Sequence, residues 1–184
     1  MLSIPEDTTQ IVRQGVERAC RDLSQRLEPL GFARTRKMLW TRRSTHTAQF
    51  IHLHRSGSTY GKPINYSVSF RIELGIRVLN DLFEAPALNG PTSDDLSLGK
   101  GYHLRFNAST GSTYDRCIDD LSRFVLERGE PWFKRFGAAE ALLKHDSPLR
   151  EAEKERLRAA MGGQHQPEVV AKSLALLGIK EKRA

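Results

Sequence analysis

Residues 64–76, INYSVSFRIELGI, alternate apolar and polar side chains over most of their length. The apolar positions run from Ile64 to Leu74 in steps of two, and the polar positions between them are Asn65, Ser67, Ser69, Arg71 and Glu73. Successive side chains of a strand point to opposite faces of its sheet, so the stretch predicts a strand with one face on a core. The polar face requires a separate explanation.

The segments around this strand predict the other elements of one domain. Apolar residues at helical spacing indicate an N-terminal helix ended by Pro29 and Gly31, and a second helix over about 113–128 ended by Gly129. Further strands are expected at about 36–43, 47–55 and within 102–109, with a hairpin loop over 55–63. The fold class that follows is α+β: an antiparallel sheet of about four strands with helices packed on one face.

Two stretches lie outside that pattern. Residues 80–101 contain two prolines and three glycines without a sustained period, so a long loop is expected there. Residues 147–184 predict a helical C-terminal extension, with helices over about 147–161 and from Pro167 to Gly178. The first of these helices has a sparse apolar stripe, which indicates loose docking on a single α+β domain formed by residues 1–146.

The basic residues are concentrated in the first part of the chain. The formal net charge is +7, and residues 1–79 carry 13 Lys and Arg against 6 Asp and Glu, so this part holds the whole excess. Between Arg34 and Arg77, nine basic residues face one acid, Glu73. Such a segment favours an acidic protein, an anionic ligand or nucleic acid as partner. Lys and Arg are also common at exposed strand edges, where they prevent aggregation, so the charge alone does not require a partner.

The composition and the N-terminal sequence also indicate the general class of the protein. A chain of 184 residues with 39% hydrophobic residues can bury a core, and no apolar run approaches the roughly 18 residues of a membrane span. The N-terminus, MLSIPEDTTQ, lacks a secretion signal, so a cytoplasmic protein without a membrane partner is expected. Cys20 and Cys117 are expected as free thiols among apolar neighbours. No cofactor is expected, and the oligomeric state stays open.

Several short stretches in a fixed order resemble a known family. LEPLGF, LW, IHLHRS, SFRIELGI and GEPWF follow one another over roughly residues 16–136, and this order resembles the domain of unknown function 4304 family. The resemblance implies a common fold and no particular activity. Three positions depart from the family pattern, because His54 and Arg55 stand where Gln and Lys are usual, and Glu73 stands where Asn is usual.

The common catalytic motifs are absent from the sequence. It contains no Gly-x-Ser-x-Gly elbow, no His-Glu-x-x-His, no Cys-x-x-Cys and no complete phosphate loop. IHLH places His52 and His54 two residues apart, on one face of a strand, where two imidazoles can share a metal. The first expectation is a protein without a metal, and a metal-dependent hydrolase that uses His52, His54 and Glu73 is the alternative.

The polar side of the sheet gives the leading hypothesis. If the apolar positions of each strand face the helices, the other side collects the candidate binding residues Arg71, Arg105, His52, His54, His103, Asn107 and Ser69. Arginine offers planar two-point contacts to carboxylate or phosphate groups. We therefore expect an intracellular binding protein, of adaptor or toxin-neutralising type, that presents a basic, open sheet face to an acidic partner.

Nucleic-acid association is a third hypothesis. Sheets that bind single strands expose aromatic residues for stacking, and here the candidates are Phe50, in phase with His52 and His54, and Tyr60. Helices or the 80–101 loop could instead cover the polar face, whose groups would then only satisfy one another.

Overall fold

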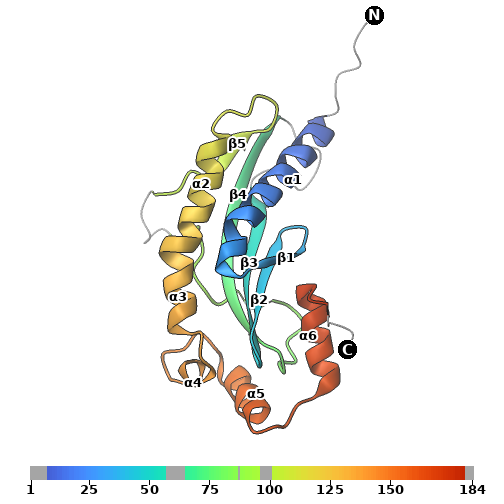
Figure 1. Ribbon diagram of the computed structural model, residues 1–184, viewed down its shortest axis with the longest axis vertical. Coiled ribbons are helices and arrows are strands. Elements are labelled where there is room, and N and C mark those ends of the chain that lie inside the picture. Colours follow the sequence, from blue (N-terminus) through green and yellow to red (C-terminus); the bar gives the residue numbers. More distant parts are fainter. Residues whose placement is uncertain (1–7, 57–64, 87, 96–100, 181–184) are drawn as a thin grey trace, which may run out of the picture.

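The computed structural model describes residues 8–56, 65–86, 88–95 and 101–180, and these form an α+β fold around one antiparallel sheet (Figure 1). The described strands neighbour one another in chain order: β1 (Ala33–Arg36), β2 (Leu39–Arg43), β3 (Thr47–Ser56), β4 (Ser67–Val78) and β5 (Arg105–Asn107). The predicted fold class is confirmed. The sheet gains a fifth strand because the short β1 precedes and pairs with β2.

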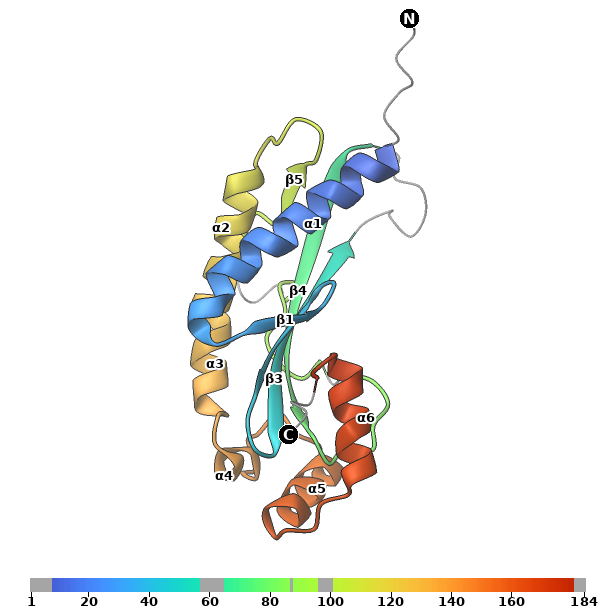
Figure 2. The same ribbon diagram turned by 45° about the vertical axis from the view of Figure 1, so that its right-hand side comes forward.

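Helices cover the first face of the sheet, which carries the apolar side chains of β4. α1 (Thr8–Leu27) crosses this face diagonally, and α2 (Tyr114–Phe124) runs along one side of it (Figures 1 and 2). Val68, Phe70, Ile72 and Leu74 are buried in one core cluster, as the alternation predicts. Trp40 is also fully buried in this cluster. A short 3-10 helix (Glu28–Leu30) follows α1, and the short α4 (Ala139–Leu142) contributes Leu142 to the same core cluster.

The predicted helix at 113–128 does not end at Gly129. α2 continues through a π-helical turn (Val125–Gly129) into α3 (Glu130–Arg135). Gly129 keeps helical dihedral angles, with φ −73° and ψ −59°, and a Cβ there would lie 2.9 Å from Leu74 Cδ1. The glycine therefore lets the helix approach β4 closely instead of ending it. The π-helical turn ends two residues before Pro131, which lacks the N–H that a regular helix would use.

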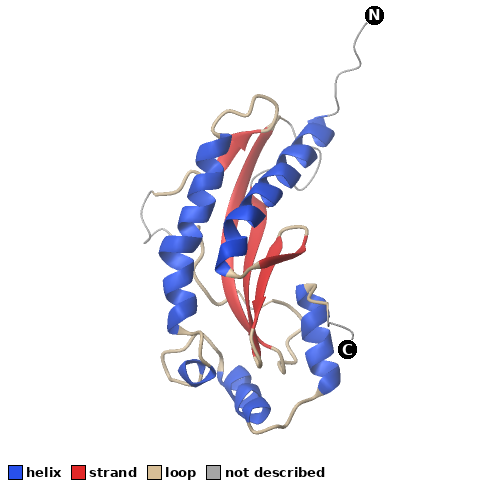
Figure 3. Ribbon diagram, viewed as in Figure 1, coloured by secondary structure: helices blue, strands red, loops and turns tan. Residues whose placement is uncertain are grey.

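α6 (Pro167–Leu177) covers part of the second sheet face. Leu39, Ala48 and Phe50 point to this face and are buried with Leu79, Leu174 and Leu177 in a second cluster. Thr35 Oγ1 donates a hydrogen bond to the carbonyl oxygen of Leu177 at 2.6 Å. Helices were expected over one face only, and α6, which lies beside the lower end of the sheet in Figure 3, adds a partial layer on the other face.

α5 (Glu151–Met161) lies at the end of the sheet, between α4 and α6 in the chain (Figure 1). Leu157 on this helix is fully buried in the main core, together with Leu149 just before it. Glu153 and Lys154 are buried as well. The C-terminal helices thus share their buried surface with the sheet, while the division of the chain at residue 146 stays a prediction.

Part of the segment expected as a long loop pairs with the edge of β4. Gly90 N–H donates to the carbonyl oxygen of Leu74, Leu74 N–H donates to that of Pro91, and Ser93 N–H donates to that of Ile72, each at 3.0 Å. A Cβ at Gly90 would lie 2.8 Å from the Leu74 oxygen, so glycine permits this approach. Residues 90–93 therefore extend the sheet edge. Most of the hairpin loop predicted over 55–63 lies outside the described residues.

Two further expectations concern the chain as a whole. None of the helices in the described residues is long and apolar enough to cross a membrane. Cys20 and Cys117 are free and buried, as predicted. Burial raises the pKa of the Cys20 thiol to about 11 and that of Cys117 to about 12, so both side chains are neutral packing groups.

Candidate functional site

The register of β3 and β4 brings four polar residues together. His52 pairs with Glu73, and His54 pairs with Arg71, across the two strands. Residues two apart on a strand share a face, so all four side chains leave the sheet on the second face. Phe50, which lies beneath α6, precedes His52 on the same face. The polar cluster therefore begins where the cover of α6 ends.

The side chains of this cluster are in direct contact. His54 Nε2 lies 3.0 Å from Glu73 Oε2, and Arg71 Nη2 lies 2.9 Å from Glu73 Oε1. The ring centroids of His52 and His54 are 3.8 Å apart. One ligand atom from each of His52, His54 and Glu73 lies within 4.8 Å of the other two. Two imidazoles and one carboxylate form a known ligand set for Zn²⁺ and for non-haem Fe²⁺.

His52 is neutral at physiological pH. Burial is the main cause that lowers the pKa of this imidazole to about 4, and the neighbouring His54 and Arg71 lower it as well. Its Nδ1 atom is buried and has no hydrogen-bond partner among the described residues. A neutral imidazole with an available ring nitrogen is the form of histidine that binds a metal.

Arg71 is held between two carboxylates. One guanidinium nitrogen contacts Glu73, and Nη1 lies 3.3 Å from Asp94 Oδ2 at the sheet edge. Counted with formal side-chain charges, Arg71, Glu73 and Asp94 together carry −1. The face is therefore less basic around His52 and His54 than the sequence indicates.

Two other predicted residues share this face at the far end of β4. Ser69 pairs with Arg105 across β4 and β5, and Arg71 follows Ser69 on the same side of β4. Arg105 is exposed, and its guanidinium has no hydrogen bond or ion pair within the described residues. Ser69 and Arg105 thus extend the polar face beyond the His52 cluster.

The last two predicted residues have local roles. Asn107 Oδ1 accepts hydrogen bonds from the backbone N–H groups of Ser109 and Thr110, so this side chain shapes the turn after β5. His103 precedes β5, and its backbone N–H donates to Asp120 Oδ2 on α2 at 2.6 Å. Neither side chain has a hydrogen bond, ion pair or ring contact with His52 or His54 in the part of the chain that the structure describes.

Several arginines of the basic segment form ion pairs and hydrogen bonds within the molecule. Arg34 Nη1 lies 2.7 Å from Glu17 Oε1, and Arg42 Nη2 lies 3.1 Å from Glu130 Oε1. Arg77 is buried and donates to the backbone carbonyls of residues 81, 83 and 85. Part of the charge asymmetry in the sequence is therefore used inside the molecule.

The aromatic residues considered for base stacking do not form a platform. Phe50 is fully buried in the cluster beneath α6, so it is not available to a nucleic acid. Tyr60 lies outside the described residues. The nucleic-acid hypothesis stays a prediction that rests on charge.

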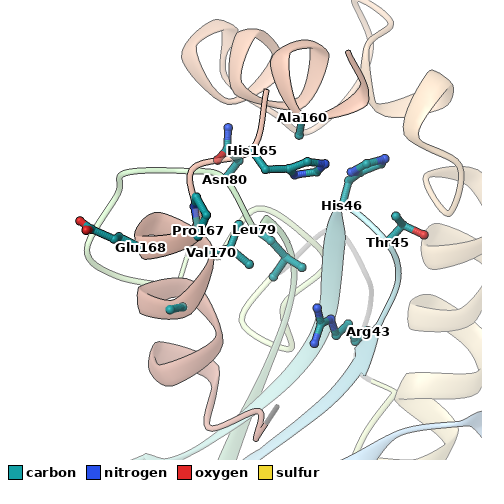
Figure 4. Close-up of a pocket in the computed structure, with 11 residues that line it drawn as sticks. Arg43, Thr45, His46, Leu79, Asn80, Ala160, His165, Pro167, Glu168 and Val170 are labelled. Carbon is teal, nitrogen blue, oxygen red and sulfur yellow. The ribbon is translucent and has the colours of Figure 1, made fainter. Parts of the chain in front are cut away.

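A pocket at the opposite end of the sheet was not predicted. It has a volume of about 600 Å³ and lies between the β2–β3 turn, the end of β4, and the start of α6 (Figure 4). Arg43, His46, Leu79, His165 and Val170 are among its lining residues. No sequence signal links these residues, because the pairing of β3 with β4 brings the first two segments together and the docking of the C-terminal segment against them adds the third.

Comparison with known proteins identifies no relative. The chain matches no family model, no curated protein and no solved structure. The resemblance to the domain of unknown function 4304 family therefore stays a prediction, and the function is inferred from the geometry of the site.

Proposed function

We propose that the protein binds a divalent transition-metal ion through His52, His54 and Glu73. The observation that supports this most directly is the convergence of one ligand atom from each residue within 4.8 Å. Two imidazoles and one carboxylate suit Zn²⁺ or Fe²⁺. They do not suit Ca²⁺ or Mg²⁺, which take oxygen ligands.

Metal binding requires a small movement of the three side chains. Ligand atoms on a tetrahedral Zn²⁺ with bonds of about 2.0–2.1 Å are roughly 3.4 Å apart. Glu73 Oε2 would exchange its contact with His54 for the ion, while Arg71 continues to hold Oε1. An outer partner of this kind orients a ligating carboxylate. The net charge of −1 around Arg71, Glu73 and Asp94 is compatible with a dication.

Three protein ligands leave a coordination position open, as in catalytic zinc sites. A water molecule there would be activated as a nucleophile, and the alternative of a metal-dependent hydrolase would use the site in this way. Metal binding is the step that this alternative requires first, so it is the step to test.

The test is direct metal analysis of the full chain purified without a histidine tag. We expect about one equivalent of Zn²⁺ or Fe²⁺, or stoichiometric uptake of Zn²⁺ by the metal-free protein in a calorimetric titration. Replacement of native metal by Co²⁺ gives a visible absorption spectrum that reports the ligand geometry. His52→Ala and Glu73→Gln should each weaken Zn²⁺ binding at least tenfold, which corresponds to about 1.4 kcal/mol.

The matched control is His145→Ala, because His145 is exposed and belongs to a different surface. This variant should bind Zn²⁺ like the unmodified protein. Circular dichroism of each metal-free variant establishes that it is folded. Absence of Zn²⁺, Fe²⁺ or Co²⁺ binding by the folded protein, or equal binding by folded His52→Ala, contradicts the proposal.

An acidic partner on the same face is a second candidate, which Arg105 favours because this exposed guanidinium has no partner among the described residues. Arg105 shares this face with Ser69 and Arg71. We expect the double variant Arg71→Ala with Arg105→Ala to remain folded and to bind a poly-glutamate peptide at least tenfold more weakly. Unchanged affinity in the folded double variant, or no binding by the unmodified protein at low salt, eliminates this candidate.

A further inference from the structure

The pocket beside α6 is built from three separate parts of the chain. The end of β2 contributes Arg43, the turn after it contributes His46, and the residue after β4 contributes Leu79. His165 comes from the segment that leads into α6, and Val170 comes from the first turn of α6. Two hydrogen bonds of the buried Asn80 connect these parts, because its side chain accepts from Gln166 N–H at 3.1 Å and donates to the Gln164 carbonyl oxygen at 3.4 Å.

The polar groups that line this pocket have unused hydrogen-bonding capacity. The Arg43 guanidinium makes no hydrogen bond or ion pair within the described residues. The His46 and His165 rings are stacked with centroids 5.5 Å apart, and His46 Nδ1 is buried without a hydrogen-bond partner in the described structure. Figure 4 shows the two rings at one side of the pocket and the Arg43 side chain at the other. Three donor side chains thus surround one space.

The wall between these donors is apolar. Leu79 is buried at the base, and Val170, Pro167 and Ala160 line the sides (Figure 4). A volume of about 600 Å³ is in the range of small-molecule sites, which combine an apolar lining with a few polar groups that fix orientation. Arginine and imidazole N–H groups select a ligand with acceptor oxygens and negative charge.

We propose that this pocket binds a small organic anion, with its carboxylate between Arg43 and the His46–His165 pair and its apolar body against Leu79 and Val170. The planar guanidinium can contact both carboxylate oxygens, while the apolar body covers the half-buried Val170, part of which otherwise faces water. Glu168 at the rim disfavours a second negative group on the ligand, so a monoanion is expected. The proposal uses none of the three proposed metal ligands and stands or falls independently of them.

The test is a titration of the ¹⁵N-labelled full chain with phenylacetate, followed by NMR. We expect saturable shifts of backbone signals at His46, His165 and Val170, without shifts at His52 and His54. Two further ligands test separately whether binding requires the negative charge and the apolar body. Acetate has the charge without the apolar body, and benzylamine has a similar body with the opposite charge, so each should bind at least tenfold more weakly than phenylacetate.

Arg43→Met removes the charge of an exposed side chain and should weaken phenylacetate binding at least tenfold. Arg13→Met is the matched control, because Arg13 is also exposed and lies on α1, and it should leave binding unchanged. The proposal is overturned by the absence of saturable shifts up to about 10 mM phenylacetate, by equal binding in the folded Arg43→Met variant, or by equal binding of acetate or benzylamine.

Discussion

On β3, Phe50 and His52 lie two residues apart and point to the same face of the sheet, yet their surroundings differ completely. Phe50 is fully buried against α6, together with Leu39 and Ala48. His52 belongs to a half-buried polar cluster with His54 and Glu73. The alternation of a strand decides which face a side chain joins, but an element more than 100 residues later decides whether that face is core or surface.

The largest expected effect comes from removal of α6. Deletion of residues 167–184 exposes the apolar side chains beneath the helix, and it leaves the buried Arg77 without Ser173. We expect the free energy of unfolding to fall by more than about 4 kcal/mol, a large part of the total stability of a domain of this size. Urea unfolding followed by circular dichroism measures the loss.

A loss below about 1 kcal/mol would mean that α6 is loosely attached and that the second face is open along its whole length. The control is deletion of residues 181–184 alone, which keeps the whole of α6 and should leave the unfolding midpoint unchanged.

Phe50→Ala tests, with a single side chain, the part of the second sheet face that α6 covers. Phe50 is fully buried, so its truncation leaves a cavity beneath α6 and should cost about 3–5 kcal/mol. The matched variant is Phe83→Ala, because Phe83 is an exposed phenylalanine and should cost less than about 1 kcal/mol. Thermal and urea unfolding of both variants compare the two sites. Equal losses would show that Phe50 is not enclosed by α6 in solution.

Arg77→Lys tests the buried hydrogen bonds that connect β4 to α6 and to residues 81–85. The guanidinium donates to Ser173 Oγ at 2.9 Å, to the Ala85 carbonyl oxygen at 3.0 Å, and to those of Asp81 at 3.1 Å and Phe83 at 2.6 Å. Burial lowers the pKa of this group, so these contacts offset its loss of hydration. Lysine keeps the charge but cannot form the same set of bonds, and we expect a loss of about 2–3 kcal/mol.

The control for this substitution is Arg13→Lys on the exposed side of α1, which should change the free energy of unfolding by less than about 0.5 kcal/mol. If Arg77→Lys is as mild as Arg13→Lys in urea unfolding, the carbonyls around residue 77 are satisfied by water.

The parts of the fold that could be predicted are those with a local cause. Alternation predicted the faces of Val68 and Phe70, helical spacing located α1 and α2, and Pro167 and Gly178 marked the ends of α6. Gly129 was wrongly predicted as a helix end because a glycine stop signal and a glycine at a close helix–strand contact look the same in sequence. Only the position of Leu74 distinguishes them.

The candidate site could be predicted only in part. The spacing of His52 and His54 places both on one face, which the structure bears out. That Glu73 lies opposite His52 depends on the register between β3 and β4, and the intervening hairpin loop allows more than one register. The pocket at Arg43 depends on where α6 docks, a non-local packing event without a sequence motif.

The smallest expected effect belongs to the part of the second face that α6 does not cover. Ser69 is half-buried beside Val68, which is fully buried on the opposite face. Val68→Ala removes two methyl groups from the core and should cost about 1–2 kcal/mol. Ser69→Ala removes one hydroxyl group, which has no hydrogen-bond partner among the described residues, and should change the free energy of unfolding by less than about 0.5 kcal/mol. Urea unfolding of the two neighbours compares the two faces of one strand directly. A loss above about 1 kcal/mol for Ser69→Ala would mean that this part of the face is also covered, because an exposed hydroxyl can be replaced by water at little cost whereas an enclosed one cannot.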